Sequence, residues 1–497
     1  MKRGAPVRTQ GPADGGTIFE EGAPGRRASS FAPSDLPPAL VPESHRRATP
    51  PRLPEVAEID IVRHYTRLSQ MNHGVDTGFY PLGSCSMKYN PKVAEVLAQA
   101  PGFARIHPAQ PDRTVQGTLE LMWRLERALC EITGMARATL QPPAGACGEL
   151  TGLLMMRAYH GDRGDERETV LIPAAAHGTN PASVRSGGYR AVTVPADARG
   201  LVDVAALRDA LDGRVAGLML TNPNTLGLFE RDIRTITDLV HEAGGLVYYD
   251  GANLNAIMGR TRPGDMGFDI VHINTHKTFA TPHGGGGPGA GPVGVVEDLV
   301  PYLPVPRVER TDDGYRTEDD VPSSIGRMHG FHGNVGILVR AYIYVLLHGA
   351  DGLARVSDHA VLNANYLAAL LRDVFPPVYD ERPMHEFVSS ARDLKAATGM
   401  RATDVAKRVI DLGFHPSTVY FPLVVEEALM VEPTETESRA TLERFADALA
   451  QAAEEAASDP DLLREAPITT PVRRLDEVRA ARELRLSWRP ADGAAPA

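Results

Sequence analysis

Residues 269–294 read DIVHINTHKTFATPHGGGGPGAGPVG. The apolar run at 269–274 predicts a strand, Lys277 follows it closely, and 283–294 is dense in glycine. A lysine at the end of a buried strand, beside backbone that can approach a ligand, suits a covalent imine with an aldehyde cofactor. Two other interpretations are a surface lysine in a flexible loop and a nucleotide phosphate loop, although a phosphate loop has its glycines before the lysine. Lys277 is therefore the candidate reactive residue, and it needs partners elsewhere in the chain.

The first candidate partner is Asp250, which closes the run GLVYYD at 245–250. Apolar and aromatic residues ending in a carboxylate indicate a buried parallel strand that delivers the acid to the carboxyl edge of a sheet, where α/β enzymes bind ligands. Pyridoxal phosphate needs an acid at such a place, because a carboxylate facing its pyridine nitrogen keeps the ring protonated and able to accept electrons. The other interpretation of Asp250 is a helix N-cap or turn residue.

Two further segments complete the pattern. His177 follows the apolar run at 169–172, and its imidazole is suited to stack on a cofactor ring, although a polar loop histidine is the simpler interpretation. The small-residue turn Ala144-Gly145-Ala146 precedes a helical stretch. Small residues opening a helix expose free N–H groups and the positive end of the helix dipole, which suits a phosphate.

The order of phosphate turn, histidine, aspartate and lysine resembles the aspartate aminotransferase-like (fold type I) pyridoxal-phosphate enzymes. Longer stretches resemble, more narrowly, the glycine decarboxylase (P protein) family of the glycine cleavage system. These stretches are NHGVDTGFYPLGSCSMKYNP at 72–91, YYDGANLNA at 248–256, residues 274–291, GFHPSTVYFPL at 413–423 and EEALMVEPTETE at 426–437. The resemblance extends from about Glu55 to Arg489.

The resemblance implies roles for further residues. Thr275 and His276 stand where related enzymes bind the cofactor phosphate, and Ala252 stands where a small residue packs against the ring. Asn222 occupies the position of an asparagine near the phenolic oxygen, although an Asn-Pro turn residue is an equal alternative. Cys147 departs from the pattern, because His or Gln is expected there.

The resemblance also implies the reaction. The expected activity is pyridoxal-phosphate-dependent decarboxylation of glycine, with transfer of the aminomethyl group to the lipoyl arm of the H protein. The chain length resembles the lysine-bearing subunit 2 of a split P protein, which implies an α2β2 assembly with glycine dehydrogenase subunit 1. One alternative is another fold type I enzyme acting on glycine, serine or threonine, of the aldolase or hydroxymethyltransferase type. The other is a non-catalytic scaffold subunit, which usually lacks the lysine.

The composition is that of an ordinary soluble globular protein. The chain has 497 residues, 43% hydrophobic and 23% charged, with a formal charge of −11, which argues against a nucleic-acid surface. Cys85, Cys130 and Cys147 have neither paired nor metal-ligand spacing, so we expect no metal site and a reducing compartment. The sequence has no long uninterrupted apolar run, and acidic residues interrupt the basic N-terminus. We therefore expect no membrane span, no transit peptide and a cytoplasmic location.

Strand-like runs alternate with helical patterns through most of the chain, which predicts an α/β fold with a mostly parallel sheet and helices on both faces. The expected divisions are an extended arm at 1–54, a large cofactor-binding domain at 55–345, and a small α+β domain with a tail at 346–497. The strands are expected at 169–172, 191–194, 216–221, 246–250 and 269–273 in the large domain, and at 386–389 and 428–431 in the small one.

Overall fold

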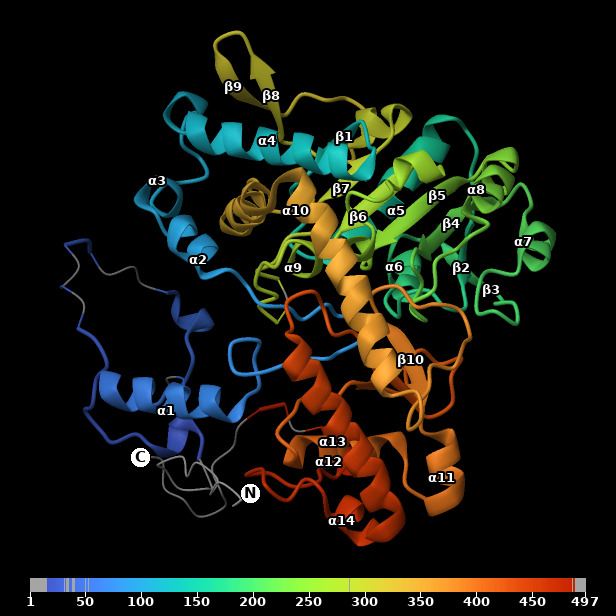
Figure 1. The fold of residues 1–497 in the computed structure, drawn as a ribbon. Helices are drawn as coiled ribbons and strands as arrows, with labels where there is room; N and C mark the ends of the chain where they lie inside the picture. Colours follow the sequence, from blue (N-terminus) through green and yellow to red (C-terminus); the bar gives the residue numbers. More distant parts are fainter. Residues whose placement is uncertain are drawn as a thin grey trace. The chain divides into compact units, whose positions relative to one another are not determined.

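The computed structural model describes residues 16–30, 32, 35–37, 41–49, 51, 53–285, 287–484 and 486–487 (Figure 1). The chain forms two compact units. One contains residues 75–464, and the other contains residues 1–74 together with 465–497. All the candidate site residues lie in the first unit.

The larger sheet of that unit has the strand order β1-β7-β6-β5-β4-β2-β3. Its strands are β1 Arg137–Thr139, β2 Thr169–Pro173, β3 Arg190–Val194, β4 Val215–Thr221, β5 Leu246–Gly251, β6 Ile270–Ile273 and β7 Val293–Val295. The strands β2 to β6 pair in parallel, whereas β7 is antiparallel to both of its neighbours. Every residue of β4 and β5 is buried, as expected for central strands of a parallel sheet. The predicted parallel α/β sheet is confirmed.

Helices cover both faces of this sheet because successive residues of each strand point to opposite sides. On one face, Val247 and Tyr249 of β5 belong to the hydrophobic cluster that includes residues of α4 (Gln116–Thr133) and α8 (Ile233–Glu242). On the other face, Tyr248 packs with residues of α5 (Gly145–Asp162) and α6 (Asn180–Ser186). The helix α7 (Val204–Ala210) contributes Leu207 to the first cluster.

A smaller antiparallel sheet follows, with the order β10-β12-β11. Its strands are β10 Phe387–Ser390, β11 Thr418–Val419 and β12 Ala428–Val431. The neighbouring helices are α11 Arg392–Thr398, α12 Ala402–Asp411, α13 Arg439–Ser458 and α14 Pro460–Glu465. One hydrophobic cluster joins this sheet to α12 and α13 through Phe387, Val405 and Phe445. These elements form the α+β region that the sequence predicts.

The long helix α10 spans Val335–Leu370, with non-helical backbone at Gly349 (φ 59°, ψ −177°). Within the described residues it is the one helix long and apolar enough to cross a membrane by length and composition. Core packing accounts for part of this composition, because Leu338, Val339 and Leu353 are buried in hydrophobic clusters. The expected domain boundary after residue 345 falls inside α10, and that division stays a prediction.

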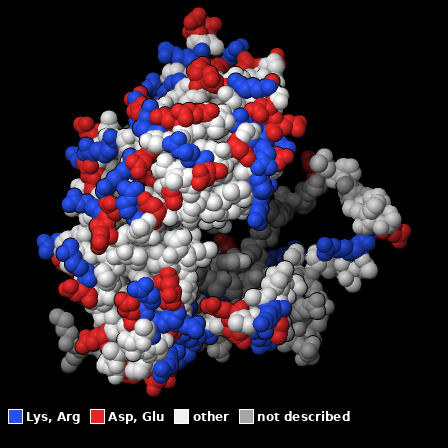
Figure 2. All heavy atoms as spheres, turned by 90° about the vertical axis from the view of Figure 1, so that its right-hand side faces the viewer, with Lys and Arg blue, Asp and Glu red and all other residues white. Residues whose placement is uncertain are grey.

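The remaining elements of this unit are short. They include α2 Lys92–Ala98, α3 Pro101–Ala104 and the hairpin β8 Arg307–Thr311 with β9 Gly314–Glu318. On the face that Figure 2 shows, basic and acidic side chains are interspersed. A surface of mixed sign is the usual arrangement for a chain of this composition.

The second unit contains α1 Glu58–Met71 and α15 Glu477–Arg482. Short 3-10 turns stand at Ile18–Glu20 and Glu43–His45, in the segment predicted to be an extended arm. Residues 1–15 of that arm lie outside the described part of the chain.

Candidate functional site

Lys277 lies on the single-turn helix α9 (Thr275–Thr278), which follows β6 directly. Its side chain is buried, with 5% of the residue exposed. The Nζ group donates a hydrogen bond to the Ser84 carbonyl oxygen at 2.8 Å. The interpretation as a surface lysine is therefore wrong, and the amine is fixed at the carboxyl edge of the sheet.

Asp250 lies on β5, next to the strand that leads to Lys277, and it is fully buried. Its carboxylate accepts hydrogen bonds from the Asn180 amide at 2.7 Å and from the Ala252 N–H at 2.9 Å. His272 Nε2 lies 3.3 Å from Asp250 Oδ1. Burial alone raises the pKa of the Asp250 carboxyl, but His272, His177, Asn180 and Lys277 together outweigh burial and lower it. Asp250 is thus kept as a buried anion.

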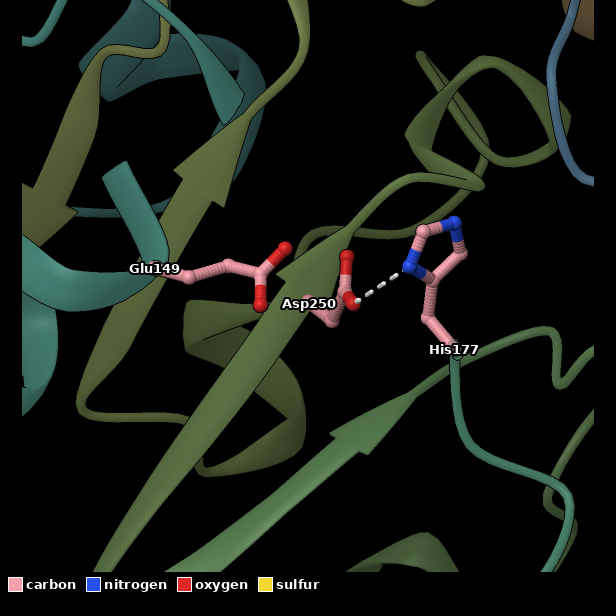
Figure 3. A group of neighbouring side chains, drawn as sticks. All are labelled: Glu149, His177 and Asp250. Carbon is pink, nitrogen blue, oxygen red and sulfur yellow. Dashed lines mark ion pairs between the residues drawn. The ribbon is translucent and has the colours of Figure 1, made fainter. Parts of the chain in front are cut away.

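Figure 3 shows Asp250 between the side chains of Glu149 and His177. His177 Nδ1 lies 4.0 Å from Asp250 Oδ2. The oxygens of Glu149 accept hydrogen bonds from Thr179 and Ser183, both at 2.6 Å. The carboxylates of this group have the spacing of metal ligands, yet protein donors already occupy their oxygens. We assign the group to hydrogen bonding.

Two histidines beside Lys277 are held neutral. Burial, followed by the charge of Lys277, lowers the pKa of His177 to about 4. The same two causes, joined by His283, lower the pKa of His276 to about 3. The His276 and His283 rings meet edge to face with centroids 4.6 Å apart. A neutral imidazole at His177 suits stacking on an aromatic ring.

The predicted phosphate turn opens α5, with Ala144 as the N-cap residue and Gly145 and Ala146 in the first turn. The first N–H groups of any helix lack partners within the helix. The turn packs tightly against the segment around Lys277, because a Cβ on Gly145 would lie 1.7 Å from Asn274 Oδ1. Cys147 follows in the same turn, and burial raises the pKa of its thiol. The helix start and the lysine are thus brought together.

Gly291 of the glycine-rich segment makes an equally close approach, because a Cβ there would lie 2.2 Å from the Ala144 carbonyl oxygen. Gly291→Ala is therefore expected to lower the free energy of unfolding by about 1–3 kcal/mol through overpacking, and to weaken cofactor binding. Urea unfolding and a cofactor titration measure the two effects. The matched control is Gly161→Ala in α5, where a Cβ meets nothing within 4 Å and no loss is expected. Equal stability of the two variants would contradict the close approach.

The structure gives protein partners to three other predicted residues. Asn222 Oδ1 accepts a hydrogen bond from the Glu230 N–H at 3.0 Å, as a turn residue does. The Thr275 hydroxyl donates to the Ala290 carbonyl at 3.0 Å. Ala252 is fully buried two residues after Asp250. Their expected contacts with the cofactor stay predictions.

Lys88 forms a largely buried ion pair next to α9, with 0% of its own side chain and 8% of the Glu435 side chain exposed. Its Nζ donates to Glu435 Oε1 at 2.7 Å and to the Thr278 carbonyl at 3.1 Å. Burial by itself lowers the pKa of Lys88, but Glu435 and Tyr344 outweigh burial and raise it. The pair therefore places a charged lysine against the backbone that presents Lys277.

Glu435→Ala is expected to cost about 3–5 kcal/mol of unfolding free energy, because the Lys88 ammonium is left buried without a counter-charge. Denaturant unfolding checks this value. The control is Asp76→Ala, which breaks the exposed Lys92–Asp76 pair, whose side chains are 55% and 54% exposed. That change is expected to cost less than about 1 kcal/mol. Similar losses in both variants would refute the role of burial.

Several contacts of the site escaped the sequence analysis. Ser84, Asn180 and His272 contact Lys277 or Asp250. Glu386 accepts a hydrogen bond from the Ser84 N–H, and Glu432 accepts one from the Ser86 N–H. Glu386 precedes β10 and Glu432 follows β12. A carboxylate at the end of an apolar strand is the signal that identified Asp250, and it could have identified Glu432. Glu386 stands before its strand, so this signal does not apply to it.

The donor set fits pyridoxal phosphate. One edge of the sheet holds a buried amine, a buried carboxylate on the adjacent strand, and a helix start with free N–H groups. Within the described residues, the buried Thr278 Oγ1 and His272 Nδ1 have no hydrogen-bond partner. The fold and site define a fold type I pyridoxal-phosphate enzyme. A family model described as "Glycine cleavage system P-protein" matches residues 30–316, and one described as "Glycine dehydrogenase, C-terminal domain" matches residues 356–462. The chain belongs to the glycine cleavage system P-protein family.

Curated relatives agree with this family. The chain is 56% identical over 476 residues to the "Probable glycine dehydrogenase (decarboxylating) subunit 2" of Caldanaerobacter subterraneus subsp. tengcongensis, covering 95% of this chain and 98% of that protein. It is 58% identical over 452 residues to the protein of the same name from Exiguobacterium sibiricum, covering 91% and 92%. The resemblance to subunit 2 that the sequence indicates is confirmed.

Solved structures support the fold. A crystal structure of glycine decarboxylase (P-protein) of the glycine cleavage system, in inhibitor-bound form, matches with a TM-score of 0.70 at 22% identity, covering 83% of this chain and 93% of that chain. The glutamate decarboxylase of Lactobacillus brevis CGMCC 1306 matches with a TM-score of 0.63 at 16% identity, covering 85% and 96%. At these identities the likeness concerns the fold.

Proposed function

We propose that this chain is the lysine-bearing subunit of a two-subunit glycine decarboxylase. In this proposal Lys277 holds pyridoxal phosphate as a covalent imine, and glycine loses its carboxylate as CO2. The aminomethyl group passes to one sulfur of the oxidised lipoyl arm of the H protein, and the lipoyl disulfide is cleaved and reduced. The observation that carries the proposal is a buried Asp250 on β5 and a buried Lys277 on α9, directly after the neighbouring strand β6. The chain is also 56% identical to a relative named for glycine decarboxylation.

Each site residue has a part in the proposal. When bound, pyridoxal phosphate supplies an electron sink for the bond broken at the α-carbon of glycine. Asp250 remains anionic at neutral pH and holds a proton on the ring nitrogen. The neutral His177 ring stacks on the cofactor, and Lys277 moves protons at the reacting centre. The first turn of α5, with Thr275 and His276, binds the phosphate.

The partners belong to the proposal as well. The relatives are named subunit 2, which supports a complementary subunit 1. We place the two in an α2β2 heterotetramer in the cytoplasm, where the lipoylated H protein reaches the site.

The decisive test is the release of labelled CO2 from carboxyl-labelled glycine by this chain with lipoylated H protein, with and without subunit 1. Release that requires subunit 1 is the expected result. Bound cofactor without any release would instead favour an aldolase or hydroxymethyltransferase, which cleaves or transfers a carbon unit without releasing CO2. Absence of a cofactor imine would favour a scaffold subunit.

A further inference from the structure

The loop of residues 82–88 connects the small sheet to the candidate reactive lysine. At one end, Leu82 forms an antiparallel bridge with Val431 of β12. In the middle, the Ser84 carbonyl accepts the hydrogen bond from Lys277 at 2.8 Å. The loop therefore contacts both the lysine and the small sheet.

The backbone of this loop is strained at two serines. Ser84 has φ 60° and Ser86 has φ 43°, in the left-handed region that residues other than glycine seldom adopt. Such backbone persists where surrounding contacts hold it, and it is common at functional sites. Each strained N–H group donates to a different glutamate, Ser84 to Glu386 at 2.6 Å and Ser86 to Glu432 at 2.9 Å.

Both glutamates are fully buried. Their other carboxylate oxygens also accept hydrogen bonds. Glu386 Oε1 accepts from the Asn253 amide at 3.1 Å. Glu432 Oε1 accepts from the Ser86 hydroxyl and from the Asn255 amide. Because protein donors occupy every one of these oxygens, we assign the two carboxyl groups to holding the loop and not to binding a metal ion.

A third buried side chain accompanies the pair. His385 Nε2 lies 3.9 Å from Glu386 and 3.8 Å from Glu432, and neither ring nitrogen has a hydrogen-bond partner within the described residues. Burial, together with the neighbouring charge of Glu432, raises the pKa of Glu386 well above its ordinary range. A neutral glutamine is therefore a fair substitute for Glu386 in experiments.

We propose that Glu386 and Glu432 are positioning residues for Lys277, acting through the strained Ser84–Ser86 backbone to hold the Ser84 carbonyl against the lysine amine. This inference rests on the proposed function only in taking Lys277 as the reactive lysine. The two glutamates flank the small sheet, at the start of β10 and the end of β12. A displacement of that sheet therefore moves the acceptor of the Lys277 hydrogen bond.

The test measures how readily the Lys277 amine reacts with an acylating reagent in the full-length, cofactor-free chain. A short pulse of acetic anhydride followed by peptide mass spectrometry gives the labelling of Lys277 relative to Lys92 in the same molecules. Lys92 is the internal standard for the reagent, because its side chain is 55% exposed and it lies outside the loop of residues 82–88. Thermal unfolding and circular dichroism are recorded for each variant.

Glu386→Ala is expected to raise the Lys277-to-Lys92 labelling ratio about tenfold, the effect of losing one net hydrogen bond. Glu386→Gln is expected to stay within about twofold of the unaltered chain, because its amide oxygen still accepts from Ser84. The matched control is Glu427→Ala. Glu427 is also buried, directly before β12; it accepts a hydrogen bond from the Ala402 N–H at 2.9 Å and pairs with Lys395 at 2.7 Å. The Glu427→Ala substitution should lower the stability of the chain without changing the labelling ratio.

An unchanged ratio in a folded Glu386→Ala chain would overturn the inference, as would an equal rise in Glu427→Ala. If Glu386→Ala does not fold, Glu386→Asp is measured instead. That change keeps the carboxyl group but withdraws it from Ser84 by one methylene, and an unchanged ratio again overturns the inference. Borohydride reduction of the chain loaded with pyridoxal phosphate, followed by peptide mapping, separately tests the proposed function, which fails if the cofactor is not on Lys277.

Discussion

Lys277→Ala is expected to abolish the imine absorbance of added pyridoxal phosphate and to reduce CO2 release from glycine by at least about 10²- to 10⁴-fold, the usual contribution of a proton-transferring side chain. The physical reason is that the buried Nζ of Lys277 lies at the sheet edge beside Asp250, where no exposed lysine can replace it. The fold should persist, because the substitution removes one hydrogen bond to Ser84 and leaves the Lys88–Glu435 pair intact.

Absorbance spectra, labelled CO2 release and circular dichroism of the altered chain check this result. The matched control is Lys92→Ala, which removes a lysine whose side chain is 55% exposed and is expected to leave spectrum and turnover unchanged. A Lys277→Ala chain that keeps the imine spectrum would refute the assignment of Lys277.

The parallel sheet and the pair of Lys277 and Asp250 could be predicted because local patterns determine them. Each central strand is a short apolar run, and the carboxyl ends of parallel strands meet at one edge of a sheet. The strand predicted at 246–250 is β5, Leu246–Gly251, and that predicted at 169–172 is β2, Thr169–Pro173. Short apolar runs of this kind are typical of strands that are buried on both faces of a sheet.

The contacts around Lys277 depend on parts of the chain that are distant in sequence. The stretch at 72–91 is visible as a family resemblance, but nothing local indicates that Ser84 accepts a hydrogen bond from Lys277. The left-handed backbone of Ser84 and Ser86 is also hidden, because serine seldom adopts it without tertiary support. Glu386 and Glu432 supply that support from the small sheet.

The direction of the Asn222 side chain could not be predicted from the sequence. Its position after β4 is the one that the resemblance predicts, and β4 is Val215–Thr221. The side chain, however, accepts a hydrogen bond from Glu230. The sequence allowed a turn residue or a cofactor contact. The observed bond is compatible with a turn residue, and the cofactor contact stays a prediction. Side-chain direction depends on packing that single-residue patterns do not encode.

Asp250→Asn is expected to retain cofactor binding while lowering the rate of CO2 release by about 10²- to 10³-fold, the effect of removing one pre-organised electrostatic group. Asparagine keeps the size of the side chain, so the loss reflects charge. Asp250 is held as an anion by His272 at 3.3 Å and by the Asn180 amide at 2.7 Å. A neutral amide at this position cannot hold a proton on the ring nitrogen.

The control for Asp250→Asn lies at the opposite end of the same strands. Asp269 precedes β6, accepts from the Val247 N–H at 2.7 Å and pairs with His241 at 2.8 Å. Asp269→Asn removes the same charge from a comparable aspartate–histidine pair, at the end of β6 opposite to α9. It is expected to change stability slightly and turnover little. Because the two substitutions are chemically identical, a large loss confined to Asp250→Asn would identify the charge beside Lys277 as the cause, and near-normal turnover in that variant would refute its electrostatic role.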